Sequence, residues 1–227
     1  MRTVAGVDYL ASLDELVDPS RVAIIVLNMQ NYLVSENSAY MKAGGDVAAL
    51  TSIVQRIKHV LKVARELGVL VTYGEYITHD ESNNNMLTGP MLYANRNTAT
   101  VSEVVAGTWD AQTLEEVAPT AGDIVITHSR SSAMYNTILE DVLKMREIKN
   151  LIVTGASTDG FILDTAVGTV QYGYYATIIR DCVISLDPHA HKVALAWMSS
   201  RFPIFDSEQV LAAWSSNRGH DQHSLTT

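Results

Sequence analysis

The stretch LIVTGASTDGFILDTAVGTVQYGY, residues 151–174, decides the fold of this chain. It begins with apolar and β-branched residues that do not alternate with polar ones, which is typical of a strand buried on both faces. The turn GASTDG (155–160) follows, and apolar residues at helical spacing come next. A buried strand that runs through a tight turn directly into a helix is the repeating unit of α/β folds.

The same order of strand and helix recurs along the whole chain. Asp46 offers an N-cap for a long helix, and Gly68 offers a residue that tolerates its left-handed end. Repeated units with short connections predict a three-layer α/β/α, Rossmann-like fold with a mostly parallel sheet of about six strands. Strands are expected at 21–28, 70–76, 123–127, 150–155, 175–181 and 203–206, and helices at about 47–67, 136–147, 160–172 and 188–200.

The length of 227 residues fits one large domain, which we place at 21–214. Residues 1–20 are an N-terminal extension. The last residues, SSNRGHDQHSLTT (215–227), lack apolar periodicity, so we expect a mobile tail there.

The composition excludes several classes of partner. The net charge is −9 and no run of Lys or Arg occurs, so a nucleic-acid partner is not expected. The start of the chain has no signal-peptide core, and the apolar run VAIIVL (22–27) is too short to span a bilayer. The single cysteine, Cys182, fits a reducing compartment. We therefore expect a soluble, cytoplasmic protein without a membrane partner.

Sites in parallel sheets lie beyond the carboxyl ends of the strands, where the strand order reverses. The polar residues at these positions are Asn28 with Gln30, Glu75 with Tyr76, Thr127 with His128, and the turn 155–161. No strand is followed by GxGxxG or a Walker A pattern, so no nucleotide cofactor is expected.

Several strand-end segments together resemble the isochorismatase-like (cysteine hydrolase) superfamily. The resemblance covers about residues 20–210 and implies the same three-layer fold, a small-molecule substrate and a homodimer or homotetramer. The segments are VAIIVLNMQNYL, GTWDAQTLEEVAP, GDIVITHSRSSAMYNTILEDVL, LIVTGASTDGFILDTAVGTVQYGY and RDCVISLDPHAH.

The resemblance also implies a catalytic Asp, Lys and Cys, and the matching positions here hold Asn28, His128 and Phe161. The chain is thus identified as a divergent member with all three positions replaced. A phenyl ring cannot replace the thiolate nucleophile. Cys182 maps outside the site. In relatives that bind a metal an Asp-x-His follows the second strand; Glu75 and Ile77 match it here, so no metal is expected.

The remaining polar groups suggest a different chemistry. His128 can act as acid or base near neutral pH, with Asn28 as its orienting partner. The backbone amides of Thr158, Asp159, Gly160 and Phe161 match the family's oxyanion hole, and the resemblance implies a cis peptide bond at Ala156–Ser157. The alternative is that these residues are polar packing and a normal strand-to-helix turn.

Further residues are candidates for substrate binding. Arg130 could pair with a carboxylate, or form only a surface ion pair with Glu140 and Asp141. Tyr32 and Trp109 are expected in the pocket or at a subunit contact. The full set of substrate-binding candidates is Gln30, Tyr32, Glu75, Tyr76, Trp109, Arg130 and Ser157.

GASTD also resembles the GxSxG turn of α/β-hydrolases, with Ser157 as nucleophile. Asp181 or Asp187, followed by His189 or His191, would complete that family's chain order. Asp159 stands where the sharp turn requires a small residue, which argues against this alternative.

Two functions follow from these residues. The leading hypothesis is a hydrolase or lyase that acts on a small carbonyl or carboxylate compound without a cysteine nucleophile, with His128 as acid or base. The alternative is a catalytically silent relative that binds a small ligand or a protein partner, with its pocket blocked by the Phe161 ring.

Overall fold

The structure is a computed structural model that describes residues 1–36, 39–42, 44–80, 84–85, 88–94 and 104–224. Its centre is a sheet of six strands, all parallel, in the order β10-β9-β8-β3-β4-β7. This confirms the predicted α/β fold with a parallel sheet of six strands. The bounds are β3 (Val22–Leu27), β4 (Leu70–Tyr76), β7 (Ile124–His128), β8 (Asn150–Ala156), β9 (Tyr175–Ile184) and β10 (Ile204–Phe205).

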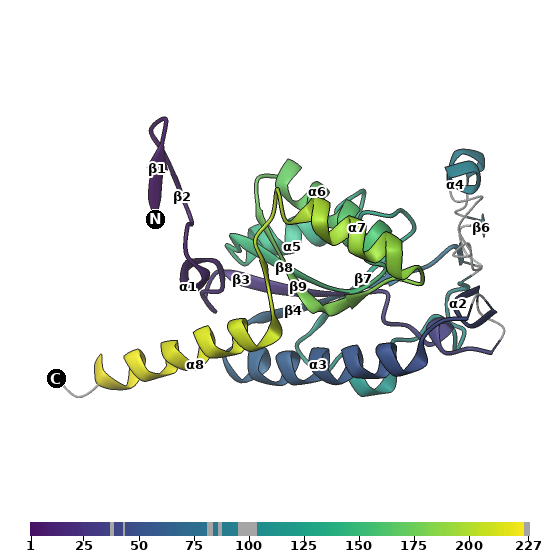
Figure 1. The fold of residues 1–227 in the computed structure, drawn as a ribbon, viewed down its shortest axis with the longest axis horizontal. Coiled ribbons are helices and arrows are strands. Elements are labelled where there is room, and N and C mark those ends of the chain that lie inside the picture. Colours follow the sequence, from purple (N-terminus) through teal and green to yellow (C-terminus); the bar gives the residue numbers. More distant parts are fainter. Residues whose placement is uncertain (37–38, 43, 81–83, 86–87, 95–103, 225–227) are drawn as a thin grey trace.

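Helices cover both faces of the sheet and complete three layers (Figure 1). One core lies between the sheet and α3 (Val47–Glu66) with α8 (Ser207–Ser224). The second core lies on the opposite face and includes residues of α5 (Leu139–Met145), α6 (Leu163–Gln171) and α7 (Pro188–Met198). Because β3 and β8 are covered on both sides, all of their residues are buried, as their unbroken apolar runs predict.

Helix α3 begins and ends where the sequence indicates. The Asp46 side chain accepts a hydrogen bond from the Ala49 amide, and Gly68 adopts a φ of 73° just beyond the helix. The apolar side chains of α3 face the sheet and are buried from Leu50 to Ala64.

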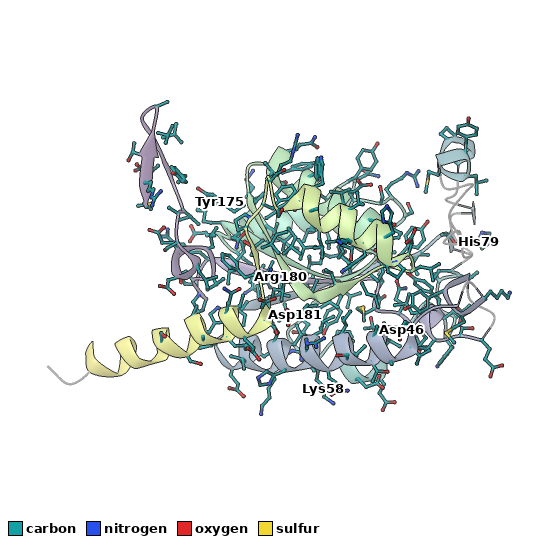
Figure 2. All side chains as sticks on the ribbon, in the orientation of Figure 1. Asp46, Lys58, His79, Tyr175, Arg180 and Asp181 are labelled. Atoms are coloured by element: carbon teal, nitrogen blue, oxygen red, sulfur yellow. The ribbon has the colours of Figure 1, made fainter. Side chains whose placement is uncertain are left out.

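Strand β9 is longer than predicted. Arg180 and Asp181 are charged and suggest the end of a strand, yet β9 continues to Ile184. Both charges have partners: Arg180 forms an ion pair with Asp206 at 2.8 Å, and Asp181 accepts hydrogen bonds from the Ser207 amide and hydroxyl at 2.8 and 2.6 Å. Figure 2 shows the two residues on the strand, with Asp181 toward α3 and the start of α8. Tertiary contacts thus allow charged residues inside this strand.

Both ends of the chain contain secondary structure. Helix α8 continues to Ser224, through most of the predicted tail, and the mobility of that tail stays a prediction. The first turns of α8 are anchored by the buried Val210 and Trp214, and helix propagation from an anchored start is favourable. The N-terminal extension forms a hairpin and one helical turn, β1 (Arg2–Val4), β2 (Val7–Tyr9) and α1 (Leu13–Leu16). The boundaries of the domain itself stay predictions.

The two ends of the domain meet at the amino end of the sheet. The Trp214 indole donates a hydrogen bond to the Val17 carbonyl at 2.7 Å, and the Asn150 side chain donates one to the Leu16 carbonyl at 2.7 Å. The Leu10 amide donates to the hydroxyl of Tyr175, the first residue of β9 (Figure 2).

Short elements lie mainly on the connections. They are the 3₁₀ turns Asn31–Leu33 and Glu115–Val117, α2 (Ala39–Lys42), β5 (His79–Asp80), β6 (Asn84–Asn85) and α4 (Gly89–Ala94). In the described part of the chain, no helix combines the length and apolar character that crossing a membrane requires.

The strand order reverses between β3 and β8. From β3 the chain passes to β4 and β7 on one side, then crosses back to β8, β9 and β10 on the other. Ligands of such sheets bind beyond the carboxyl ends of the strands at this reversal, which places Asn28 and the turn after β8 at the expected site.

Candidate functional site

Asn28 and His128 meet at the carboxyl end of the sheet. Asn28 follows β3 with a φ of 55°, and His128 is the last residue of β7. The Asn28 Oδ1 and His128 Nε2 positions lie 2.9 Å apart, although the residues are 100 positions apart in the chain. The sequence therefore predicts this juxtaposition correctly.

Gly74 on the intervening strand β4 lies beside this contact. A Cβ atom at Gly74 would lie 2.5 Å from Leu27 Cδ2 and 3.4 Å from the imidazole of His128. The first distance is too short, so a side chain at Gly74 would have to displace the end of the Leu27 side chain. The second distance is a close van der Waals contact, so the same side chain would touch the imidazole.

The imidazole of His128 is buried and held at both nitrogens. Only 2% of the residue is exposed, and Nδ1 lies 2.7 Å from the Arg130 carbonyl oxygen. Burial lowers the pKa of His128 to about 4, and the Arg130 carbonyl opposes this only in part. The ring is therefore neutral near pH 7.

The Phe161 ring packs against the same imidazole. The Phe161 and His128 ring centroids are 5.8 Å apart in a T-shaped arrangement, and Tyr76 contacts Phe161 edge-on at 4.8 Å. Tyr76 also lies 5.8 Å from the His128 ring. The residues at positions 28, 128 and 161 thus gather in one place, with two aromatic rings against the imidazole.

The turn after β8 is pressed against the end of β3. The Ala156–Ser157 peptide bond is cis, as expected. Gly155 adopts a φ of 111°, and a Cβ atom there would lie 2.1 Å from the Leu27 carbonyl oxygen. After the cis bond, residues Thr158–Ile162 form a π-helical turn, where the sequence predicts the start of an ordinary helix.

Two of the four expected anion-binding amides have partners inside the protein. The Asp159 amide donates to Ser185 Oγ at 3.2 Å, and the Gly160 amide donates to the Ser157 carbonyl at 3.3 Å. The Ser185 hydroxyl in turn donates to the Asp159 carboxylate at 2.6 Å. The candidate anion-binding amides are thereby reduced to those of Thr158 and Phe161.

A small cavity lies beside Phe161. It has a volume of about 30 Å³, enough for one or two water molecules. Of the described residues that line it, four are aromatic and none carries a charge; Asn28 and His128 are not among them. The described lining is Tyr32, Leu33, Tyr40, Tyr76, Val104, Ala156, Ser157, Phe161, Ile184, Ser185 and Leu186.

Three of the substrate-binding candidates line this cavity, namely Tyr32, Tyr76 and Ser157. Burial, with a contribution from Tyr76, raises the pKa of Tyr32, so its hydroxyl keeps its proton. Gln30 instead joins two backbone segments. Its amide nitrogen donates to the Tyr76 and Ala111 carbonyls at 3.1 and 2.8 Å, and its oxygen accepts from the Tyr76 amide at 2.8 Å.

The remaining candidates lie elsewhere. Glu75 accepts a hydrogen bond from Thr113 Oγ1 at 2.7 Å and lines a separate depression, since successive strand residues face opposite sides of a sheet. Trp109 is 57% exposed. The Arg130 guanidinium donates to the Ser129 carbonyl and hydroxyl at 3.0 and 3.1 Å and lines another surface depression.

Sequence reasoning missed Tyr40, Ser185 and Leu186, which line the cavity. Ser185 follows the true end of β9, so a correct length for that strand would have identified it as a strand-end residue. Tyr40 comes from α2, a short helix without a periodic pattern. No signal in the sequence singles it out.

The recorded partners of the serine-hydrolase candidates are residues other than Ser157. His191 Nδ1 lies 2.9 Å from Thr158 Oγ1, Asp187 caps α7, and Asp181 binds Ser207. Cys182 is fully buried and burial raises the pKa of its thiol. Among the residues that the structure describes, no three His, Cys, Asp or Glu side chains are grouped as metal ligands would be.

Comparison with known families gives one clear match. The family model of the isochorismatase domain matches residues 22–209. The ureidoacrylate amidohydrolase RutB of Yersinia enterocolitica is 30% identical over 186 residues, which cover 78% of this chain and 81% of that protein. The RutB protein of Caulobacter segnis is 29% identical over 196 residues, or 82% of each chain.

Solved structures show the same fold. A cysteine hydrolase from Pseudomonas syringae pv. phaseolicola superimposes with a TM-score of 0.74 at 23% identity, covering 87% of this chain and 94% of the other. The nicotinamidase PncA of Bacillus subtilis gives a TM-score of 0.67 at 21% identity, covering 82% of this chain and 99% of the other.

Proposed function

The chain belongs to the isochorismatase family, and from that premise we propose that it is a member that binds a small, uncharged ligand without hydrolysing it. The observation that carries the proposal is the state of His128. Both of its nitrogens contact protein atoms, its pKa is about 4, and the Phe161 ring packs against it. A side chain in this state has no free position from which to exchange a proton with a substrate.

The residues at the family's reactive positions support the same proposal. Phe161 matches the position of the cysteine nucleophile, and it supplies neither a thiolate nor a proton. Asn28 and His128 match the positions of the Asp and the Lys, and in this pair neither residue carries a charge near pH 7. The groups that would supply and activate a nucleophile are therefore missing together.

The cavity indicates the chemistry of the ligand. Its described lining combines aromatic and aliphatic side chains with the hydroxyls of Ser157 and the tyrosines. A charged ligand would lose its hydration there without gaining a counter-ion, which is costly. An uncharged molecule with an apolar body and one hydrogen-bonding group fits best. The cavity is small, so the Phe161 ring must turn aside to admit it.

A second candidate is a hydrolase or lyase that acts on a small carbonyl or carboxylate compound with His128 as acid or base. The hydrogen-bonded contact between His128 and Asn28 at 2.9 Å favours it. In this case the Phe161 ring would have to move and expose the imidazole. In both cases we keep the homodimer or homotetramer as part of the proposal; light scattering of the purified protein tests it.

Turnover and binding assays separate the two candidates. The wild-type protein and His128→Ala are incubated with primary amides, N-carbamoyl compounds, vinyl ethers and esters, with a ureidoacrylate amidohydrolase assayed in parallel. We expect no product above background from either. Turnover by the wild type that His128→Ala abolishes would establish the second candidate instead.

Binding is measured by NMR with phenol as an uncharged probe and benzoate as its charged counterpart. We expect shifts of the Tyr76 and Phe161 signals with phenol only, and their loss in Phe161→Trp, whose larger ring fills the cavity. Equal binding of benzoate would contradict the proposed ligand class.

A further inference from the structure

The two contacts of the His128 imidazole determine where its proton lies. The partner of Nδ1 is the Arg130 carbonyl oxygen at 2.7 Å. A carbonyl oxygen only accepts hydrogen bonds, so Nδ1 must carry a hydrogen. In a neutral imidazole the other nitrogen is then bare and needs a donor.

The Asn28 amide supplies this donor only in one of its two orientations. The atom drawn 2.9 Å from His128 Nε2 is the oxygen Oδ1, which would require a hydrogen on Nε2 as well and hence an imidazolium. His128 is 2% exposed. Its other described contacts are Tyr76, Phe161 and the Arg130 carbonyl, and no carboxylate is among them. A buried cation without a counter-ion is unfavourable. A half turn of the Asn28 amide exchanges its oxygen and nitrogen in place.

The amide nitrogen of Asn28 gives a second reason for the same half turn. Asn28 Nδ2 is the buried side-chain polar atom that has no hydrogen-bond partner in the described part of the chain. Turning the amide places this nitrogen against the bare Nε2 and pairs both groups. It leaves the carbonyl oxygen of Asn28 as the unpaired atom, and a buried acceptor of this kind needs a donor.

We propose that Asn28 and His128 form a neutral pair in which the Asn28 amide nitrogen donates to His128 Nε2. Asn28 is thus a positioning residue that keeps His128 in its Nδ1–H form. The inference deepens the proposed function and rests on it. Its consequence for that function is that the Asn28–His128 pair has no proton to give or take near pH 7.

The form of the imidazole can be read directly by NMR on the full-length protein with ¹⁵N-labelled histidine. We expect His128 to show a protonated Nδ1 and a bare Nε2 at pH 7, and to remain neutral down to about pH 5. A hydrogen on Nε2 at pH 7, whether in the other neutral form or in the imidazolium, would overturn the proposal.

Asn28→Asp tests the pair a second way, and Asn28→Gly is its matched control, since both replacements tolerate the positive φ of this position. A carboxylate offers only acceptors, so the Asp variant should draw a proton onto Nε2 and raise the pKa of His128 by about 2 pH units. The Gly variant should titrate at least about 1 pH unit below the Asp variant. Equal titration in both variants would show that the amide does not control the imidazole.

The two proposals fail separately. Turnover in the presence of a neutral pair would refute the proposed function alone. An imidazolium at pH 7 in a protein without turnover would refute the pair alone. If Asn28→Asp does not fold, the wild-type spectrum still decides.

Discussion

Replacement of Phe161 by Ala tests whether this ring keeps solvent from His128. The ring forms two edge-on contacts, at 4.8 Å with Tyr76 and 5.8 Å with His128. Each such contact is worth about 0.5–1.5 kcal/mol beyond the apolar area that it buries. The loss of the two contacts alone should therefore cost roughly 1–3 kcal/mol of unfolding free energy, and the lost burial of the ring adds to the total that urea denaturation measures.

The effect on His128 is the more informative result. Burial lowers its pKa from the ordinary 6.5 to about 4, and each pH unit corresponds to about 1.4 kcal/mol. Burial of the imidazolium thus costs roughly 3 kcal/mol at most, and water that enters the space left by the Phe161 ring should recover a large share of it. We expect the pKa of His128 to rise by at least about 1 pH unit in an NMR titration.

Phe205→Ala is the matched control, because Phe205 is also a half-buried phenylalanine but lies on the edge strand β10. It should leave the titration of His128 unchanged. If Phe161→Ala also left that pKa near 4, the desolvation of His128 would come from the strands around it, and the Phe161 ring would have no part in keeping the imidazole neutral.

Three further outcomes are expected. The His128 pKa is about 4 in the folded chain and about 6.5 in the unfolded one, so between these pH values the unfolded chain binds the extra proton. The unfolding free energy should therefore fall by at most roughly 3 kcal/mol as the pH drops from 6.5 to 4. Urea titrations should show this fall, and a smaller one in His128→Gln. Gln30→Ala removes three buried hydrogen bonds to backbone groups and should cost about 2–4 kcal/mol in the same assay, whereas a loss under 1 kcal/mol would mean that water replaces them. Gly155→Ala places a Cβ atom 2.1 Å from the Leu27 carbonyl oxygen and should prevent folding, so a well-dispersed NMR spectrum of this variant would contradict the described turn.

The strand ends could be predicted from the sequence because parallel strands bring their carboxyl ends to one edge of the sheet. Asn28, His128 and Phe161 therefore gather as expected. The roles of the strand-end residues could not be predicted from the sequence in the same way. Gln30 is a strand-end amide that could bind either a ligand or the backbone, and only the positions of Tyr76 and Ala111 show that it binds the backbone.

Other differences arise from tertiary contacts that no local pattern contains. Strand β9 continues through Arg180 and Asp181 because Asp206 and Ser207 bind these charged side chains. Both partners lie far along the chain, so no local pattern indicates them. Gly74 has the pattern of an ordinary strand residue, although a side chain there would clash with Leu27 Cδ2 and touch the His128 imidazole. Tyr40 lies in the cavity although its short helix shows no amphipathic pattern.

The contacts that tie Val17 to Trp214 and Leu16 to Asn150 lie at the amino end of the sheet, whereas the cavity lies beyond its carboxyl end. The N-terminal hairpin and the far end of α8 also project on the same side of the molecule (Figure 1). An affinity tag, a fluorescent protein or a surface tether attached at either end would thus stay remote from the cavity, and a circular permutant that joins the two ends should keep the cavity intact.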